Sequence, residues 1–439
     1  MTIDLLCKVV DNFGDIGVVY RLARALSDAD RPGDRGPDSA SAAAGLALRL
    51  VVDDLAAFRA LLPAVDADKA FQTVNGWTVV RWDAEEAAAL FRSDPPRTVI
   101  ECFACGRPDW YEDILFDEAD GADRLIVDLE YLTAETWASD FHRLPSRTRS
   151  GRVKKALFMP GFARGTGGLI LDRRFVAARE AFLDEARRPA LRTALLDAIA
   201  AQGGRSSGAG AAGPSSAASG PLASAGQAIA GGETETPRTA AARAATAEAF
   251  WVTVFTYERD FAATVRELAA AAENRPIVVL VAAGRCAVPF LDAWEAAGRP
   301  VPAIELPFLD QATWDEVLLA SDLLIVRGED SLARAALSGR PFLWHAYPLP
   351  DGGQLAKVRA LLERLAPFFE SEDFALLERQ WLLLNAEGPG EEAGRGLADL
   401  LARAAPGGRM DASFHAWSEA LIKNGDLAAA LLTFIGELR

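Results

Sequence analysis

The stretch LLCKVVDNFGDIG, residues 5–17, begins with an apolar run of strand length and continues into a polar turn that contains two glycines. A helical spacing of apolar residues follows over residues 18–27. Short apolar runs then alternate with helical patterns, as at residues 46–52, 98–103 and 124–129. This alternation predicts a parallel sheet with βαβ crossovers.

A second α/β series starts near residue 250 and includes buried-strand patterns at residues 276–282 and 323–326. Helical patterns fill the last part of the chain, up to residues 427–438. Because the chain has 439 residues, two domains are expected. Two sequential Rossmann-like halves with a helical tail are typical of the glycosyltransferase B architecture, in which two domains face a cleft and the last helix crosses back to the first domain.

The predicted N-terminal domain covers residues 1–168, with residues 412–439 packing back on it. The predicted C-terminal domain covers residues 169–411. In the glycosyltransferase B architecture the first domain binds the acceptor and the second binds the nucleotide sugar. Within it, residues 202–247 are rich in Gly, Ala, Ser, Pro and Thr and have almost no large apolar side chain. Such a composition cannot bury enough surface to offset the entropy of ordering, so this stretch is predicted to be a disordered insertion.

Composition excludes several classes of protein. The formal net charge of −16, from 46 basic and 62 acidic residues, argues against nucleic acid as a partner. The four cysteines are too few and too scattered for a disulfide framework, and the single C-x-x-C pair, Cys102 and Cys105, lacks the further ligands of a zinc site. With no signal-peptide pattern and no long apolar run, a cytoplasmic protein without a membrane span is expected.

The first loop carries two carboxylates. Gly14 and Gly17 let the backbone turn tightly between strand and helix, but their spacing is not the dinucleotide-binding fingerprint. Asp11 and Asp15 flank Gly14, and one of them can cap the helix that follows. Capping does not easily account for both. Because carboxylates are common general bases, at least one of the two is interpreted as catalytic.

The second loop is RGEDS, residues 327–331, between a late apolar strand and a helix. Helix N-termini bind phosphate, and arginine pairs with phosphate oxygens, so Arg327, Asp330 and Ser331 are predicted to build a diphosphate pocket. A carboxylate would repel a diphosphate, so Glu329 or Asp330 must face hydroxyls, Arg327 or the backbone. The alternative is a salt-bridged loop with an N-cap and no ligand.

Aromatic side chains and an amide lie near the same predicted strand ends. The segment IELPFLDQ, residues 304–311, and Trp314 can hold a nucleobase by stacking and edge hydrogen bonds, although such residues are more often part of the core. Tyr257 and Tyr347 are candidates of the same kind. His345 is expected near this site, as a donor to a diphosphate or a hydroxyl.

With these residues in view, the chain resembles the protein-arginine rhamnosyltransferases that modify bacterial elongation factor P, the EarP family. The resemblance rests on four motifs in order, at residues 11–18 with 20–24, 306–309 with Gln311, 327–331, and 344–348. It implies the glycosyltransferase B fold. It also implies transfer of L-rhamnose from dTDP-β-L-rhamnose to an arginine of elongation factor P, with inversion and without a metal. The modified factor is then active in rescuing ribosomes stalled at polyproline.

Carried over by residue, the resemblance implies catalytic roles for Asp11, Asp15 and Glu329, with Asp15 as the more direct base and Asp11 as the orienter. The predicted donor-binding set is Phe13, Gly14, Tyr257, Phe308, Gln311, Trp314, Arg327, Asp330, Ser331 and Tyr347. The insertion departs from the family pattern. Two other interpretations stay open: another nucleotide-sugar-dependent transferase or epimerase of this fold, and a noncatalytic nucleotide-sugar-binding protein.

Overall fold

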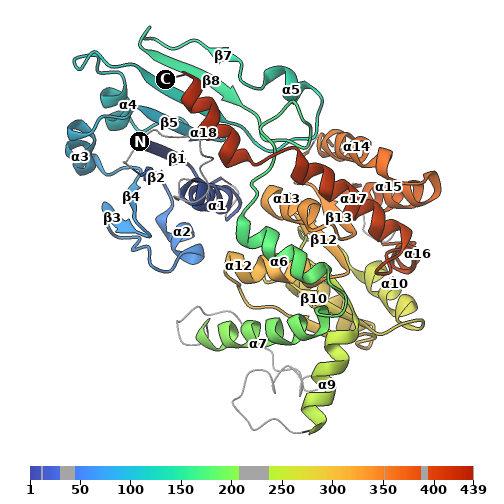
Figure 1. The fold of residues 1–439 in the computed structure, drawn as a ribbon. Helices are drawn as coiled ribbons and strands as arrows, with labels where there is room; N and C mark the ends of the chain where they lie inside the picture. The colour runs from blue at the N-terminus through green and yellow to red at the C-terminus, as the bar shows by residue number, and fades with distance from the viewer. Residues whose placement is uncertain (11–12, 30–44, 207–236, 351, 387–393, 439) are drawn as a thin grey trace. The chain divides into compact units, whose positions relative to one another are not determined.

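The computed structural model describes residues 1–10, 13–29, 45–206, 237–350, 352–386 and 394–438 (Figure 1). Contacts divide the chain into two units. Unit 1 comprises Met1–Asp172 and Leu421–Arg439, and unit 2 comprises Arg173–Ala420. The sequence had predicted divisions after residue 168 and before residue 412. Each unit is an α/β body with its own largely parallel sheet, as the alternating pattern predicted.

Unit 1 is built on an eight-stranded sheet of order β3-β4-β2-β1-β5-β6-β8-β7. The neighbours β1, β2, β4, β5, β6 and β8 pair in parallel, whereas β3–β4 and β7–β8 are antiparallel pairs at the two sides. The turn between β3 and β4 is Asn75-Gly76, and both residues have positive φ, 53° and 81°, as a tight hairpin requires. The strands are β1 (Thr2–Cys7), β2 (Ala47–Val52), β3 (Phe71–Val74), β4 (Trp77–Arg81), β5 (Thr98–Cys102), β6 (Arg124–Leu129), β7 (Pro145–Ser146) and β8 (Val153–Phe158).

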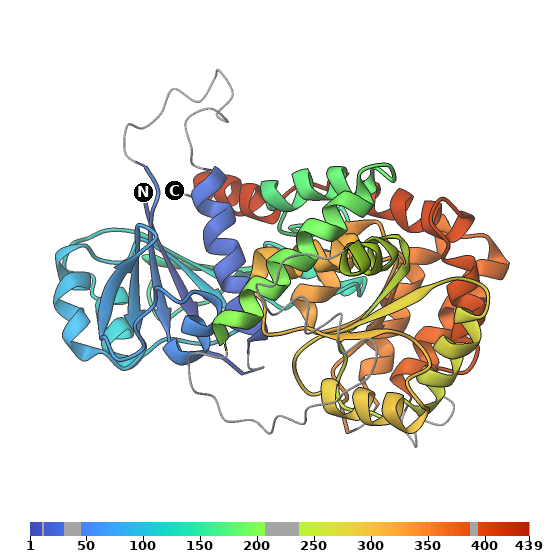
Figure 2. The same ribbon diagram turned by 90° about the horizontal axis from the view of Figure 1, so that it is seen from below.

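The last helix, α18 (Leu427–Leu438), belongs to unit 1 and lies beside α1 (Gly14–Ala29) (Figures 1 and 2). Its side chains Leu431, Phe434 and Ile435 are buried in the same core as the apolar residues of β1 and α1. The predicted return of the last helix to the first domain is therefore confirmed. The other α-helices of unit 1 are α2 (Leu55–Leu61), α3 (Ala88–Ser93), α4 (Asp109–Leu115) and α5 (Trp137–Phe141).

Unit 2 has a five-stranded, wholly parallel sheet of order β11-β10-β9-β12-β13. The order reverses between β9 and β12, which is the kind of position where open α/β sheets bind ligands at the carboxyl ends of their strands. The strands are β9 (Phe250–Val254), β10 (Ile277–Val281), β11 (Ala303–Glu305), β12 (Leu323–Arg327) and β13 (Phe342–His345). The helices are α6 (Arg173–Leu183), α7 (Arg188–Ser206), α9 (Pro237–Glu248), α10 (Ala262–Ala272), α11 (Ala287–Ala296), α12 (Gln311–Ala320), α13 (Glu329–Ser338), α14 (Gln354–Leu365), α15 (Ser371–Asn385), α16 (Leu397–Arg403) and α17 (Arg409–Lys423).

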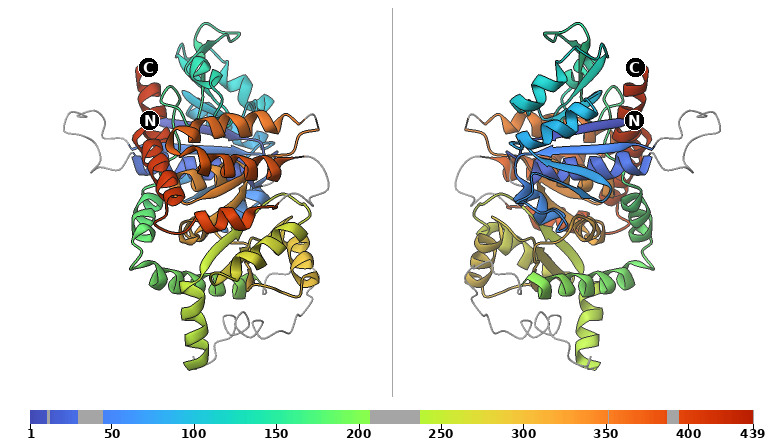
Figure 3. Two further views of the ribbon diagram at one scale, coloured as in Figure 1. Left: turned by 90° about the vertical axis from the view of Figure 1, so that its right-hand side faces the viewer. Right: turned by 90° about the vertical axis from the view of Figure 1, so that its left-hand side faces the viewer.

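The predicted disordered insertion, residues 202–247, is wrong at both ends. Helix α7 continues to Ser206, and α9 begins at Pro237 and contacts α7 (Figure 3). The segment is rich in alanine, the strongest helix former. The prediction of disorder rested on the lack of large apolar residues and did not take this helix propensity into account. Arg192 of α7 also donates hydrogen bonds to the carbonyl oxygens of residues 247 and 249, at 3.1 and 2.8 Å, which fastens the end of α9. Residues 207–236 lie outside the described part of the chain.

His142 makes the stability of unit 1 sensitive to acid. Its Nδ1 accepts a hydrogen bond from the backbone N–H of Met159 at 3.2 Å, and burial together with the nearby Arg143 charge lowers its pKa to about 4. An unfolded histidine binds its proton near pH 6.5. The stabilisation is therefore complete above pH 6.5 and is lost as the pH falls towards 4.

Replacing His142 by asparagine keeps an acceptor at the position of Nδ1 and removes the titrating group. We expect the His142→Asn chain to unfold at a similar temperature to the wild type at pH 7.5. Between pH 6.5 and 4 its melting temperature should fall less steeply than that of the wild type. The difference corresponds to the uptake of at most one proton on unfolding. Parallel acid profiles for the two proteins would contradict this assignment.

Candidate functional site

The loop between β1 and α1 starts inside the first apolar run, because β1 ends at Cys7 while the run continues to Val10. The backbone N–H of Val9 donates to the carboxylate of Asp53 at 2.8 Å, and that of Val10 donates to the carboxylate of Asp15 at 2.7 Å. These N–H groups pair with side chains and not with a neighbouring strand. Two carboxylates thus hold the backbone at the carboxyl end of β1.

Asp15 lies in the first turn of α1, which begins at Gly14 and not at residue 18 as predicted. A negative charge is favourable there because the helix dipole is positive at its N-terminus. The side chain reaches back to the preceding loop, and the residue is only 3% exposed. Phe13 packs against the core of unit 1. Asp11, the other predicted catalytic aspartate, lies outside the described residues.

In unit 2, Arg327 is the last residue of β12 and lies against two aromatic rings. Its guanidinium carbon is 4.9 Å from the ring centroid of Phe255 and 4.6 Å from that of Tyr257. Both aromatic residues lie within three positions of the end of β9, the neighbouring strand. Stacking of this kind is worth roughly 0.5–2 kcal/mol and fixes the plane of the guanidinium. The cation is therefore held in place at the carboxyl edge of the sheet.

Helix α13 starts immediately after Arg327. Gly328 has a φ of +69°, a conformation that favours glycine, and its N-cap position provides no side chain to the first turn. Glu329 and Asp330 lie in that first turn. The hydroxyl of the buried Ser331 accepts a hydrogen bond from the indole N–H of Trp314 at 3.2 Å. A strand end, an arginine and a helix N-terminus therefore coincide, as the second motif predicted.

Three buried nitrogen atoms at this edge have no hydrogen-bond partner within the described residues: Arg259 Nε, Arg327 Nε and His345 Nδ1. His345 lies opposite Arg327 in the register of β12 and β13, and its ring is 5.3 Å from that of Tyr257. The Nη1 atom of Arg259 donates to the carbonyl oxygen of Leu384 at 2.8 Å. Buried polar atoms are nearly always paired in folded proteins, so each exception needs an explanation.

The cluster carries two guanidinium groups and a buried imidazole, and the carboxylate that acts on the charge of Arg259 is that of Asp260. Burial, with the charges of Arg259 and Arg327, lowers the pKa of His345 to about 3, so the imidazole is neutral. Burial lowers the pKa of Arg259 to about 10. An anion bound here would pair with the two guanidinium groups and accept hydrogen bonds from the nitrogen atoms that have none.

The structure joins several predicted donor-binding residues through ring contacts. The Tyr257 ring lies 5.4 Å from that of Tyr347, and Trp314 lies 5.1 Å from Phe255. Gln311 is the buried first residue of α12. Phe308 is 46% exposed and lies beyond the end of β11 at Glu305. Pro307 has no N–H to donate to a sheet, which explains why β11 does not continue to Phe308.

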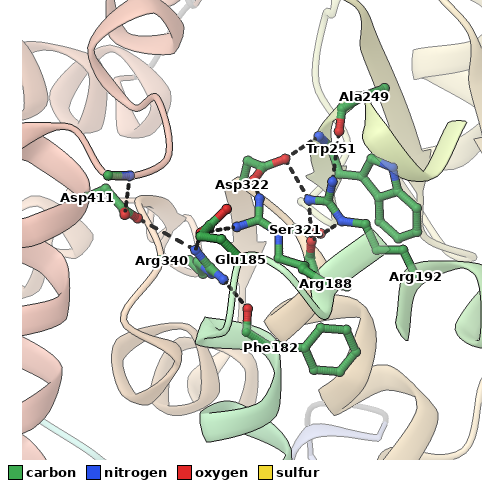
Figure 4. Close-up of polar contacts among 12 residues, drawn as sticks. Phe182, Glu185, Arg188, Arg192, Ala249, Trp251, Ser321, Asp322, Arg340 and Asp411 are labelled. Carbon is green, nitrogen blue, oxygen red and sulfur yellow. Dashed lines mark hydrogen bonds and ion pairs between the residues drawn. The ribbon is translucent and has the colours of Figure 1, made fainter. Parts of the chain in front are cut away.

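A cavity of about 240 Å³ lies at the opposite, amino-terminal edge of the unit 2 sheet. Asp322, just before β12, accepts hydrogen bonds there from the backbone N–H of Trp251 and from Arg192, each at 2.7 Å, and it also pairs with Arg188 (Figure 4). Arg340 donates to the carbonyl oxygen of residue 182 at 2.6 Å. These arginines are already bonded to protein oxygens, so the network joins α6 and α7 to the sheet and is not a second ligand site.

The C-x-x-C pair has a structural explanation. Cys102 and Cys105 are both free thiols, and burial followed by the Glu101 charge raises the pKa of Cys105 to about 12. The Cys105 thiol donates to the carbonyl oxygen of Leu6 at 3.3 Å, which ties the end of β5 to β1. In the described ranges, no group of three or more His, Cys, Asp or Glu is arranged to hold a metal. None of the described helices has the length and apolar character needed to cross a bilayer.

Comparison with known proteins decides the family. The model of the family described as elongation-factor P (EF-P) rhamnosyltransferase EarP matches residues 3–204 and 223–436. The chain belongs to this family. The chain is 31% identical over 398 residues to a protein-arginine rhamnosyltransferase of Pseudomonas putida, covering 88% of this chain and 87% of that protein. It is 30% identical over 444 residues to a protein of the same description from Pseudomonas aeruginosa, covering 99% of this chain and 98% of that one.

A solved structure described as the structural basis for EarP-mediated arginine glycosylation of translation elongation factor EF-P superposes with a TM-score of 0.53. The two chains are 22% identical, and the match covers 99% of this chain and 98% of that one. The EarP-family resemblance and the glycosyltransferase B fold are therefore confirmed, and the chain is a glycosyltransferase. The family model skips residues 205–222, inside the alanine- and glycine-rich segment.

Deleting residues 207–222 should leave folding and activity almost unchanged. The EarP family model has no counterpart for these residues, and α7 and α9 are already joined by Arg192. We expect the melting temperature to stay within about 3 °C of the wild type. A large fall in that temperature, or a loss of turnover, would show that the segment contributes to the fold or the site.

Proposed function

We propose that this EarP-family chain transfers L-rhamnose from dTDP-β-L-rhamnose to an arginine side chain of elongation factor P, with inversion at the anomeric carbon. The observation that carries the donor assignment is the group of three unpartnered buried nitrogens on Arg259, Arg327 and His345. They stand beside the N-terminus of α13, a position that favours phosphate. A diphosphate provides the negative charge and the acceptor oxygens that these atoms lack.

The rest of the donor has candidate partners around this cluster. The exposed rings of Phe308 and Tyr347 present faces for the thymine base or the sugar. The hydroxyl of Ser331 accepts from Trp314 and keeps its own hydrogen to donate to a phosphate oxygen. As the bond from the anomeric carbon to the diphosphate breaks, Arg327 and the helix N-terminus stabilise the leaving charge, so the proposal requires no metal ion.

The acceptor chemistry explains the need for carboxylates. The pKa of an arginine side chain is above about 12, so the group is protonated near neutral pH and its nitrogen atoms are poor nucleophiles. In the proposed mechanism Asp15 and Asp11 grip the guanidinium, and Asp15 takes a proton as the C–N bond forms. Glu329, in the first turn of α13, positions the sugar or the guanidinium. Attack from the face opposite the diphosphate inverts the anomeric configuration.

The test is the intact mass of unmodified elongation factor P after incubation with the enzyme and dTDP-rhamnose, with and without EDTA. We expect a gain of one deoxyhexose that EDTA does not prevent and that disappears when the acceptor arginine is lysine. The NMR coupling of the anomeric proton in the product reports the inversion. Transfer from a UDP-sugar in place of dTDP-rhamnose would point to another donor. Donor binding without any consumption would point to a noncatalytic sensor.

A further inference from the structure

The segment after β5 in unit 1 has an unusual backbone. Phe103 and Ala104 both have positive φ, 62° and 52°, although neither is a glycine. A side chain in this left-handed region costs roughly 1–2 kcal/mol per residue. Such strain persists only where the surroundings enforce it, and it concentrates at functional sites. Two hydrogen bonds fasten this turn: the N–H of Phe103 donates to the carbonyl oxygen of Leu129 at 2.7 Å, and the Cys105 thiol donates to that of Leu6.

The strained turn places one aromatic ring on another. The Phe103 ring stacks on that of Tyr131, with centroids 4.5 Å apart and an interplanar angle of 16°. Tyr131 follows β6, so the stacked pair lies at the carboxyl ends of β5 and β6. Tyr131 is 38% exposed, so part of its ring is accessible from solvent. The pair therefore offers an aromatic face to a ligand.

The stacked rings of Phe103 and Tyr131 lie at the same edge of the unit 1 sheet as the carboxylates of Asp15 and Glu130. Strand β5 is the direct neighbour of β1, and α1, which carries Asp15 in its first turn, is the next element after β1. Phe103 and Phe13 pack against the same core of unit 1. Glu130, next to Tyr131, is half-buried, and burial together with the charge of Asp128 raises its pKa, although Lys155 acts in the opposite direction. An aromatic face and carboxylates thus line one edge of one sheet.

We infer that Phe103 and Tyr131 form a stacking platform in unit 1 for a guanidinium side chain, and that this platform holds the acceptor arginine beside Asp15. A guanidinium is planar and weakly hydrated, so it stacks on aromatic faces while its edges bond to carboxylates. The strain at Phe103 fixes the platform before the acceptor arrives. This inference rests on the proposed function for the identity of the acceptor.

The experiment compares Tyr131→Leu, which removes the ring, with Tyr131→Phe, which keeps it, in the full-length enzyme. Phe71→Leu is the matched control, because Phe71 is an exposed aromatic, 50% accessible, on β3 at the far side of the same sheet. We expect Tyr131→Leu to raise the KM for elongation factor P about tenfold, the upper part of the range for cation–π contacts. Tyr131→Phe and Phe71→Leu should stay within twofold of the wild type, and the Kd for dTDP-rhamnose should be unchanged in all three.

Calorimetric titration of unmodified elongation factor P into each enzyme gives a second measurement that does not need turnover, and its Kd should change in the same pattern. An unchanged KM and Kd in Tyr131→Leu would overturn the inference. Equal losses in Tyr131→Phe and Tyr131→Leu would also overturn it, because the hydroxyl and not the ring would then be required. If the wild type binds the factor but transfers no sugar, the proposed function fails while the Kd pattern still decides the platform.

Discussion

Replacing Asp15 by asparagine is expected to lower kcat for arginine rhamnosylation by roughly 10²–10⁴-fold, the range for loss of a general base. Asparagine has nearly the same shape, and its side-chain oxygen can still accept the hydrogen bond from the N–H of Val10. The loop should therefore keep its conformation while the negative charge that holds and deprotonates the acceptor is lost. Single-turnover transfer to elongation factor P measures the effect, and the Kd for dTDP-rhamnose should change by no more than a few-fold.

Asp53→Asn is the matched control for this variant. Asp53 accepts the N–H of the adjacent Val9 at 2.8 Å, so it supports the same loop without belonging to the predicted catalytic pair. We expect Asp53→Asn to keep most of its turnover. A similar loss in both variants would mean that the carboxylates act by shaping the loop. Near wild-type turnover in Asp15→Asn would exclude Asp15 as the base.

Replacing Arg327 by lysine should weaken binding of dTDP-rhamnose and lower kcat together, with a combined loss in kcat/KM of roughly 10²–10³-fold. Lysine keeps the charge but loses the flat guanidinium that lies against Phe255 and Tyr257 and the Nε donor that has no partner within the described residues. Titration calorimetry with the donor and steady-state kinetics separate the two effects.

Arg275→Lys is the matched control on the same sheet. Its guanidinium carbon lies 3.5 Å from the ring centroid of Phe250, the first residue of β9, and so stacks at the opposite end of the strand from Arg327. We expect Arg275→Lys to leave the donor Kd within twofold of the wild type. If the two variants weaken donor binding equally, the effect of Arg327 is general destabilisation and not contact with the diphosphate.

Much of the fold followed from the sequence because its strongest patterns are local. The helix over residues 427–438 begins and ends where the apolar spacing placed it. Strand β8 was missed because Lys154 and Lys155 interrupt its apolar run, and only the folded sheet shows that Lys155 pairs with Glu101 and Asp128. Helix α7 was missed because its apolar residues repeat only weakly at helical spacing.

The candidate site was predictable where it coincides with a motif. Arg327, Ser331 and their strand-to-helix turn stand where the spacing placed them. Arg259 was missed because one arginine after a strand carries no signal of its own, and its missing partner appears only when the packing around it is known. The stacking of Phe103 on Tyr131 was also not predicted, because 28 positions separate the two rings in the sequence and only the fold brings them together.

The place of α18 in unit 1 has a consequence for synthesis on the ribosome. The strands of unit 1 are made first, but the core that they share with α1 also contains Leu427, Leu431 and Phe434 from α18. While residues 173–420 are being translated, the apolar surface that α18 covers has no native partner. Chaperones that bind nascent chains therefore have a target in unit 1, and a message cut short before codon 427 yields a protein that cannot close this core. The first unit to leave the ribosome is the last to be completed.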